Sequence, residues 1–149
     1  LKEADDIREV ARVDSDPLGG RLRVGLIPTI APYLLPRVAP KLRRSLPRLS
    51  LMLYEFRTGP LLERVREGEL DLGILALPAE TEGLETRTLF AESFVVAMPA
   101  RHALAERKRL KVADLEGEHL LLLEEGHCLR DQALEVCSSI STDEDADFR

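Results

Sequence analysis

Two cysteines stand nine positions apart near the end of the sequence, and the residues around the first favour a reactive sulfur. An apolar run, Leu120 to Leu123, leads to Gly126, and His127 and Cys128 follow directly before a segment with a helical pattern. At a helix N-terminus the helix dipole, helped by His127 and Arg130, favours the thiolate, which is the form of sulfur that attacks peroxides. Cys128 is therefore the candidate peroxide-reactive thiol.

The second cysteine, Cys137, gives that chemistry a structural consequence. Peroxide converts a thiolate to a sulfenic acid, which condenses with another thiol within reach. Cys137 is the only other cysteine and is the resolving thiol by elimination. On one continuous helix the two Cα atoms would lie roughly 13 to 14 Å apart, whereas a disulfide needs less than about 7 Å. The pair therefore predicts a switch, because forming the bond must rebuild the segment between the cysteines.

Two other interpretations of the cysteines are left open by the residues alone. Both thiols could be small buried apolar side chains in a reducing cytosol. Alternatively, His119, His127, Cys128 and Cys137 could supply the ligands of a metal ion. No C-x-x-C pair is present and the spacing fits no common zinc site, so neither a metal nor another cofactor is predicted.

The residues before this segment alternate between strand and helix patterns. The expected elements are a strand over 22–27, a helix over 32–46, a strand over 49–55, a helix over 58–67 and a strand over 70–77. Thr58 is expected to cap the second helix and Gly68 to end it, while Pro36 and Pro40 disturb the first. This β-α-β-α-β order with an apolar last strand is typical of a parallel sheet covered on both faces.

The flanking segments extend this frame. Residues 1–13 have the period of an amphipathic helix and 14–20 read as a linker or hinge, so 1–20 are expected to be the end of a helix and a hinge into the domain. The first lobe is then 21–78, and a crossover and partial second lobe take 79–149. In that part we expect strands over 84–90, 94–98 and 120–123, a connector over 111–115, a helix over 129–137 and an acidic turn over 143–147. A helix already under way at the first residue and an incomplete second sheet indicate a piece of a longer protein.

Composition and charge exclude several classes of function for these residues. The chain has 149 residues, 44% of them hydrophobic, which suffices for one domain or two small lobes. Its net charge of -6 opposes a phosphate backbone, so DNA binding by this segment is not expected. Apolar runs fall short of the roughly 20 residues of a membrane helix, and the charged first residues are no signal peptide. A cytoplasmic location without membrane contact is expected.

The cysteine segment resembles a known family. The sensing segment of OxyR, the peroxide-sensing family of LysR-type transcription regulators, is similar to Gly126-His127-Cys128-Leu129-Arg130-Asp131-Gln132-Ala133 with Cys137 beyond it. The resemblance continues through Gly25–Thr29, Pro32–Pro36, Leu70–Leu75, Asp143–Asp145 and Phe148–Arg149. It implies an α/β regulatory domain of two lobes, similar to periplasmic binding proteins and incomplete here.

The resemblance also implies a peroxide pocket beside the reactive thiol, between the two lobes. By residue match, Thr29, Thr58 and His127 would hold peroxide, and Arg130 and Asp131 would influence the reactivity and packing of the thiol. The threonines have simpler alternative roles, Thr29 as a turn residue after a strand and Thr58 as a helix cap.

Membership of this family implies a transcription regulator and not an enzyme. A disulfide between Cys128 and Cys137 would switch transcription of oxidative-stress genes, and a winged helix-turn-helix outside this chain would bind promoter DNA. The partners would be hydrogen peroxide, RNA polymerase, further copies in a homodimer or homotetramer, and a glutaredoxin- or thioredoxin-type reductant. Two alternatives are a LysR-type domain that binds a small organic effector with inert cysteines, and a thiol peroxidase. The β-α-β-α-β order argues against a thioredoxin-like peroxidase.

Overall fold

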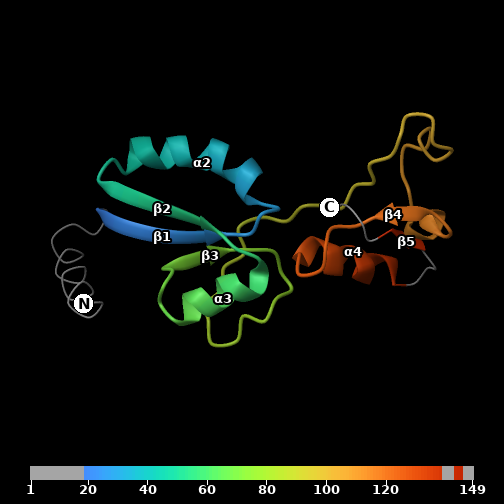
Figure 1. Cartoon of the computed structure of the whole chain (residues 1–149). Helices are drawn as coiled ribbons and strands as arrows, with labels where there is room; N and C mark the ends of the chain where they lie inside the picture. The colour runs from blue at the N-terminus through green and yellow to red at the C-terminus, as the bar shows by residue number, and fades with distance from the viewer. Residues whose placement is uncertain (1–18, 139–142, 146–149) are drawn as a thin grey trace. The chain divides into compact units, whose positions relative to one another are not determined.

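The computed structural model describes residues 19–138 and 143–145 and divides the chain into two compact units, Leu1–Gly83 and Leu84–Arg149 (Figure 1). The helix expected over 1–13 lies outside the described residues, as does nearly all of the expected hinge. Among the described helices, none combines the length and the apolar character needed to cross a bilayer.

A parallel sheet of three strands forms the centre of the first unit. Strand β1 (Gly20–Leu26) lies between β2 (Leu49–Glu55) and β3 (Leu72–Ile74), in the order β2-β1-β3. Helix α2 (Ala31–Ser45) joins β1 to β2, and α3 (Thr58–Arg66) joins β2 to β3. Because the chain moves first to one side of β1 and then to the other, right-handed crossovers place the two helices on opposite faces (Figure 1). The predicted β-α-β-α-β order is confirmed.

One face of β1 supports the apolar core beneath α2. Val24 and Leu26, two positions apart on the strand, are buried together with Ala31 at the start of α2. Partly buried apolar side chains pack around them, namely Leu22, Leu34, Leu35, Leu51 and Ile74. Alternate strand residues point to the same face, so the intervening Gly25 belongs to the face beneath α3.

Glycine lets α3 approach the other face closely. Leu61 of α3 is 0% exposed, and a Cβ built on Gly73 would lie only 2.3 Å from its Cδ2 atom. A Cβ on Gly25 would lie 2.7 Å from Leu70 Cδ1 and 3.3 Å from Leu61 Cγ. Any side chain at either glycine would occupy space that Leu61 or Leu70 now fills, so these two positions require the absence of a Cβ.

Helix α3 ends where the sequence predicts. Gly68 follows the C-cap residue Glu67 with φ +68, the left-handed region that glycine adopts without strain. The Gly68 N–H donates to Val65 O at 3.1 Å, and the Glu69 N–H donates to Arg64 O at 2.9 Å. These two bonds are the pair that defines a Schellman motif. The prediction that Gly68 ends the helix is confirmed.

Helix α2 tolerates its prolines better than expected. It begins at Ala31 rather than Pro32 and runs through Pro36 and Pro40 without a break. Both prolines lie on the exposed face. The carbonyls that lose their helical donor to a proline therefore face water, which can hydrate them.

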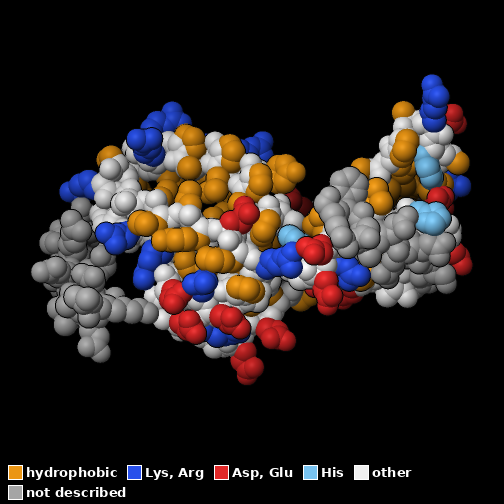
Figure 2. Space-filling model, in the orientation of Figure 1, with side chains coloured by type: hydrophobic (Ala, Val, Ile, Leu, Met, Phe, Trp, Pro, Cys, Tyr) orange, Lys and Arg blue, Asp and Glu red, His pale blue; other side chains and the backbone are white. Residues whose placement is uncertain are grey.

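Charge on the first unit is distributed unevenly. Helix α2 contains basic residues but no acidic one, whereas acidic side chains gather over α3 (Figure 2). Arg43 and Arg44 lie in the last turn of α2, where a cation interacts favourably with the helix dipole. The net charge of -6 therefore does not describe the surface of α2.

Strand β3 is shorter than predicted. Leu70, expected as its first residue, donates its N–H to Arg64 O at 3.1 Å and so belongs to the turn that ends α3. Ile27, the residue after β1, donates its N–H to Ile74 O at 3.1 Å. Residues 75–77 were expected to continue the strand, but β1 ends at Leu26 and offers them no further partner. The predicted range 70–77 is therefore too long, because only Leu72–Ile74 form the strand.

Asp71 joins β3 to β1 through the side chain and backbone of Arg23. Its carboxylate accepts the Arg23 backbone N–H at 2.6 Å and two guanidinium N–H groups at 3.2 and 2.6 Å. Burial raises the pKa of Asp71, but the hydrogen bonds and charge of Arg23 outweigh burial and hold this pKa below its usual range. The ionised carboxylate is thus bound more tightly in the folded chain than in the unfolded chain.

We expect Asp71→Asn to lower the free energy of unfolding by about 1 to 2 kcal/mol at pH 7. This value lies between the contribution of an exposed ion pair and that of a buried hydrogen bond to a charged group. Because the folded-state pKa is depressed, the wild type holds this stabilisation above the unfolded pKa of about 3.9 and loses it as pH falls through the folded value. Urea unfolding at pH 7 and at pH 3 measures both differences. Glu63→Gln, at an exposed carboxylate of α3, is the control. Equal stability of wild type and Asp71→Asn at pH 7 would contradict the expectation.

The second unit contains fewer regular elements. They are the short helix η1 (Val112–Leu115), strand β4 (His119–Leu121), helix α4 (Cys128–Cys137) and strand β5 (Asp143–Asp145). Leu115, Leu122 and Cys137 are its buried apolar side chains among the described residues. The connector expected over 111–115 is confirmed as η1, and the helix expected over 129–137 is confirmed with one additional residue at its start.

Two expectations for the second unit are wrong: one concerns the pairing of the acidic segment near the end of the chain, and the other concerns the burial of β4. The predicted acidic turn contains β5, which pairs in parallel with β4 from His119↔Asp143 to Leu121↔Asp145. Strand β4 is itself mostly exposed rather than buried as expected, so its partner need not be apolar.

The strands predicted over 84–90 and 94–98 are absent from the described structure, although the sequence there contains many apolar residues. Their side chains are largely exposed, and Val95 reaches 87%. A strand needs a partner for its hydrogen bonds, and no described strand pairs with this segment. An apolar pattern by itself was therefore insufficient.

Candidate functional site

Cys128 is the first residue of helix α4. The chain turns at Gly126, with φ +88, and His127 takes the extended N-cap conformation with φ -95 and ψ 120. The His127 N–H donates to Glu124 O at 3.4 Å, and its carbonyl accepts from the Arg130 N–H at 2.9 Å. The predicted order of strand, glycine turn and cysteine at a helix start is confirmed.

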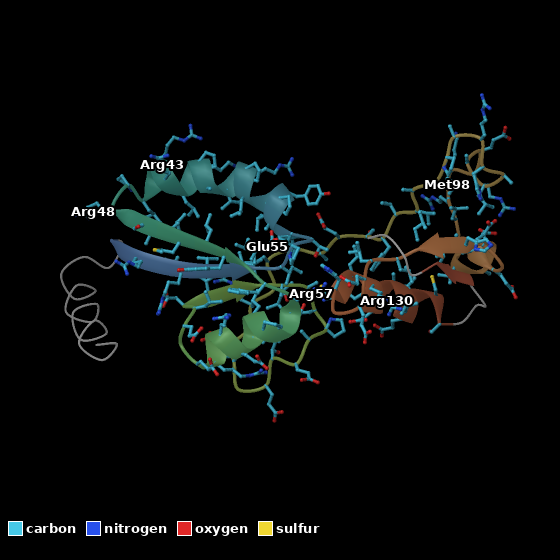
Figure 3. The ribbon with its side chains drawn as sticks, in the orientation of Figure 1. Arg43, Arg48, Glu55, Arg57, Met98 and Arg130 are labelled. Atoms are coloured by element: carbon cyan, nitrogen blue, oxygen red, sulfur yellow. The ribbon has the colours of Figure 1, made fainter. Side chains whose placement is uncertain are left out.

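Cys128 lies in the first turn of α4, at the positive end of the helix dipole. No side-chain hydrogen bond caps the helix at His127, so the positive end of the helix dipole is not neutralised by a capping oxygen. The Cys128 side chain is half-buried, and Arg130 follows within the same turn (Figure 3). Asp131 lies exposed in this turn, a position where a carboxylate interacts favourably with the dipole.

Cys137 lies at the opposite end of the same helix. It is 8% exposed, and both cysteines are free thiols. Because α4 is continuous from Cys128 to Cys137, nine residues of rise separate their Cα atoms by roughly 13 to 14 Å and turn them to opposite faces. A disulfide needs less than about 7 Å, so it cannot form while α4 is intact.

This separation also bears on the metal alternative. Two thiolates that ligate one zinc ion each lie about 2.3 Å from it. Cysteines at the two ends of a continuous ten-residue helix are too far apart to bind the same ion. Within the described residues no three His, Cys, Asp or Glu side chains gather in a way that could hold a metal ion.

Thr58 is not the helix cap that the sequence predicts. The N-cap of α3 is Arg57, in the extended conformation with φ -62 and ψ 160, and Thr58 is the first helical residue (Figure 3). Its hydroxyl oxygen is buried and has no hydrogen-bond partner among the described residues. A buried hydroxyl without a partner is costly, so this oxygen is a group that a polar ligand could satisfy.

Thr29 lies half-buried in the turn between β1 and α2. Both threonines follow the carboxyl end of a strand, and a bond from Phe56 N–H to Leu26 O at 3.1 Å joins those two strand ends. In parallel sheets that change direction at a central strand, ligands bind beyond the carboxyl ends of the strands at that point. Thr29 and Thr58 therefore share the edge where a ligand is expected.

The predicted site residues fall into two groups. Thr29 and Thr58 belong to the first unit, whereas His127, Cys128, Arg130, Asp131 and Cys137 belong to the second. Within the second unit the first four lie on the start of α4, and Cys137 lies at its end. A peroxide pocket that combines both groups stays a prediction.

Sequence reasoning gave no role to the polar contacts that hold the loop before η1. His102 Nε2 lies 3.4 Å from Glu118 Oε2, and its Nδ1 accepts the Leu104 N–H at 3.3 Å. Asp114 accepts the Lys111 N–H at 2.8 Å, which lowers the pKa of that carboxyl. Lys111 and Asp114 have the three-residue spacing of a capping box, and this spacing was the signal in the sequence for the start of η1.

Comparisons with known proteins place the chain in a family. Residues 15–145 match the family described as the LysR substrate binding domain. The hydrogen peroxide-inducible genes activator of Dickeya chrysanthemi is 43% identical over 149 residues, which are 100% of this chain and 49% of that protein. The chain thus spans about half the length of the curated relatives that it matches.

Two solved structures resemble the chain in fold as well as sequence. The oxidised form of OxyR is 46% identical, with a TM-score of 0.76 over 88% of this chain and 62% of the other. The reduced form of OxyR is 43% identical, with a TM-score of 0.77 over 89% of this chain and 61% of the other. The chain is thus similar in fold to OxyR structures solved in the oxidised and in the reduced form.

Proposed function

The chain belongs to the LysR substrate binding domain family, and from this premise we propose that it is the peroxide-sensing regulatory domain of a transcription regulator. The observation that carries the proposal is helix α4, with a half-buried thiol at its uncapped start and a buried thiol at its end. The relative from Dickeya chrysanthemi, named for peroxide-inducible activation, supports the same assignment.

The proposed chemistry consumes one peroxide and gives one disulfide. The Cys128 thiolate attacks a peroxide oxygen, the O–O bond breaks, and the leaving hydroxide takes a proton to become water. The resulting sulfenic acid is then attacked by the Cys137 sulfur, which forms the S–S bond and releases a second water. The protein's two thiols are oxidised and hydrogen peroxide is reduced.

The polar residues hold peroxide for this attack. Thr29, Thr58 and His127 donate or accept its hydrogen bonds beside Cys128, and Arg130 and Asp131 maintain the first turn of α4. The buried, unpartnered Thr58 hydroxyl supports this assignment, because a peroxide oxygen would complete its hydrogen bonding.

The switch acts through the shape of α4. Forming the disulfide unwinds this helix, and the altered surface changes packing between copies of the protein in a homodimer or homotetramer. A winged helix-turn-helix outside this chain binds promoter DNA, and the assembly contacts RNA polymerase in the cytoplasm to activate oxidative-stress genes. A glutaredoxin- or thioredoxin-type protein restores the thiols, so the domain is a sensor and not an enzyme.

Replacing Thr29 or Thr58 by Val should slow oxidation of Cys128 by peroxide about tenfold each, the effect of losing one hydrogen bond to the reacting molecule. Stability should not fall for Thr58→Val, because the change removes a buried hydroxyl without a partner. Mass spectrometry at successive times after peroxide addition gives the rate, and thermal unfolding gives the stability.

Thr81→Val, in the same unit, is the matched control. Alkylation of Cys128 by iodoacetamide, which needs the thiolate but not the peroxide pocket, should stay unchanged in all three variants. Unchanged peroxide rates in both Thr29→Val and Thr58→Val would refute the pocket. A thiol that peroxide does not oxidise at all would favour an organic-effector domain.

A further inference from the structure

The Thr58 hydroxyl is held in place by the way α3 rests on the sheet. Thr58, Leu61, Leu62 and Val65 recur at helical spacing and form the stripe of α3 that faces the strands. Leu61 and Leu62 are buried, and the Thr58 oxygen is enclosed at the start of the same stripe. A displacement of Leu61 away from the sheet must therefore carry Thr58 with it, because one helical turn joins them.

Leu61 rests on two glycines. A Cβ on Gly73 would lie 2.3 Å from Leu61 Cδ2 and 3.4 Å from Val65 Cγ2, and a Cβ on Gly25 would lie 3.3 Å from Leu61 Cγ. Contacts below 3.0 Å between such atoms do not persist, so a methyl group at Gly73 would have to displace Leu61. Leu61 is 0% exposed, so a displaced Leu61 side chain would have to move within the packed layer between α3 and the sheet.

We propose that Gly73 is a positioning residue for the peroxide reaction, because through Leu61 it sets the height of α3 above the sheet and so the location of the Thr58 hydroxyl. This inference rests on the proposed function. The strand ends around the hydroxyl are fixed independently, by Phe56 N–H to Leu26 O at 3.1 Å and by Ile27 N–H to Ile74 O at 3.1 Å. A raised α3 would therefore move Thr58 relative to the edge that carries Thr29.

The test is the rate of Cys128 oxidation by hydrogen peroxide in Gly73→Ala. We expect a slowing of about tenfold, because a misplacement approaching 1 Å at a reacting group costs up to about a hundredfold. Iodoacetamide should alkylate Cys128 at the wild-type rate. In Gly73→Ala/Leu61→Val the shorter side chain vacates the space that the new methyl group needs, and the peroxide rate should recover.

Loss of stability alone must not produce the same result. Leu51→Ala removes a side chain from the core beneath α2, on the opposite face of the sheet, and should lower the melting temperature without slowing oxidation. If Gly73→Ala does not fold at the assay temperature, Gly25→Ala provides a milder displacement of Leu61, since its Cβ would lie 3.3 Å from Leu61 Cγ, while Leu70 Cδ1 at 2.7 Å would also have to move.

A double-variant comparison shows whether Gly73 acts through Thr58. In a Thr58→Val background Gly73→Ala should cause no further slowing, because the hydroxyl that it misplaces is already gone. Slowing that persists in that background, or that Leu61→Val fails to reverse, would overturn the positioning role. Slowing by Thr58→Val without slowing by Gly73→Ala would contradict only this inference, whereas unchanged rates in Thr29→Val and Thr58→Val would contradict the pocket of the proposed function.

Discussion

A Cys128→Ser variant treated with hydrogen peroxide is expected to form neither a sulfenic acid nor a disulfide. Cys137→Ser is expected to accumulate a sulfenic acid on Cys128 and to form no intrachain bond. The asymmetry follows from the structure, because Cys128 is half-buried at the positive end of α4 whereas Cys137 is buried at the opposite end. Dimedone labelling followed by peptide mass spectrometry distinguishes the two thiols.

The control for this experiment is the double variant, in which dimedone labelling should fall to background. Cys128→Ser should keep the wild-type melting temperature within a few degrees, whereas Cys137→Ser places a hydroxyl at a buried position and is expected to lower it. Labelling concentrated on Cys137 in the Cys128→Ser protein would reverse the roles of the two thiols. Peroxide-dependent disulfide formation between two chains of Cys128→Ser would show that Cys137 reacts directly.

Local signals in the sequence predicted the end of α3 and the start of α4 well. The end of α3 depends on Gly68 and its neighbours within a few residues, and a left-handed glycine there is recognisable without knowledge of the fold. The start of α4 likewise follows from Gly126, His127 and Cys128 in direct succession. Elements of this kind are specified by interactions within one or two turns of chain.

Features that depend on distant partners were predicted poorly. The length of β3 is set by where β1 ends, far away in sequence, and β5 exists because it lies beside β4. Thr58 has the residue type of a cap, but the chain enters α3 with Arg57 in the extended conformation, which shifts the cap by one position. Residue type alone could not determine that shift.

The candidate site shows the same division. Residue types and helix geometry predicted Cys128 as the reactive thiol and its separation from Cys137. The continuous helix α4 confirms the separation, and the reactivity of Cys128 stays a prediction. The roles of Thr29 and Thr58 came from family resemblance, and the free hydroxyl of Thr58 became visible only in three dimensions. The contact of Gly73 with Leu61 joins strand to helix and leaves no recognisable pattern in the sequence.

The disulfide is expected to dismantle α4. Its ends lie roughly 13 to 14 Å apart and must come within about 7 Å, so most of the helix has to unwind. A helix of ten residues has little stability of its own, and the covalent bond can therefore overcome it. Cys137 must leave its buried position, and the half-buried Leu134 must change its surroundings. The sheet of the first unit shares no residue with this segment and should keep its structure.

Peroxide-treated Cys137→Ser is the control that separates oxidation from bond formation. It carries a sulfenic acid on Cys128 but cannot close the disulfide, so α4 should persist in it. Reduction of the oxidised wild type with dithiothreitol should restore the helix, which shows that the change is reversible and not damage.

Amide hydrogen exchange on the reduced and disulfide forms tests this switch most directly. Protection between Glu125 and Ser138 is expected to fall by at least about tenfold in the disulfide form, since amides bonded within α4 lose their partners. Amides of β1 and β2 should exchange equally in both forms. Identical protection of α4 in the two forms would contradict the account, because the two thiols would then be joined without rebuilding the helix.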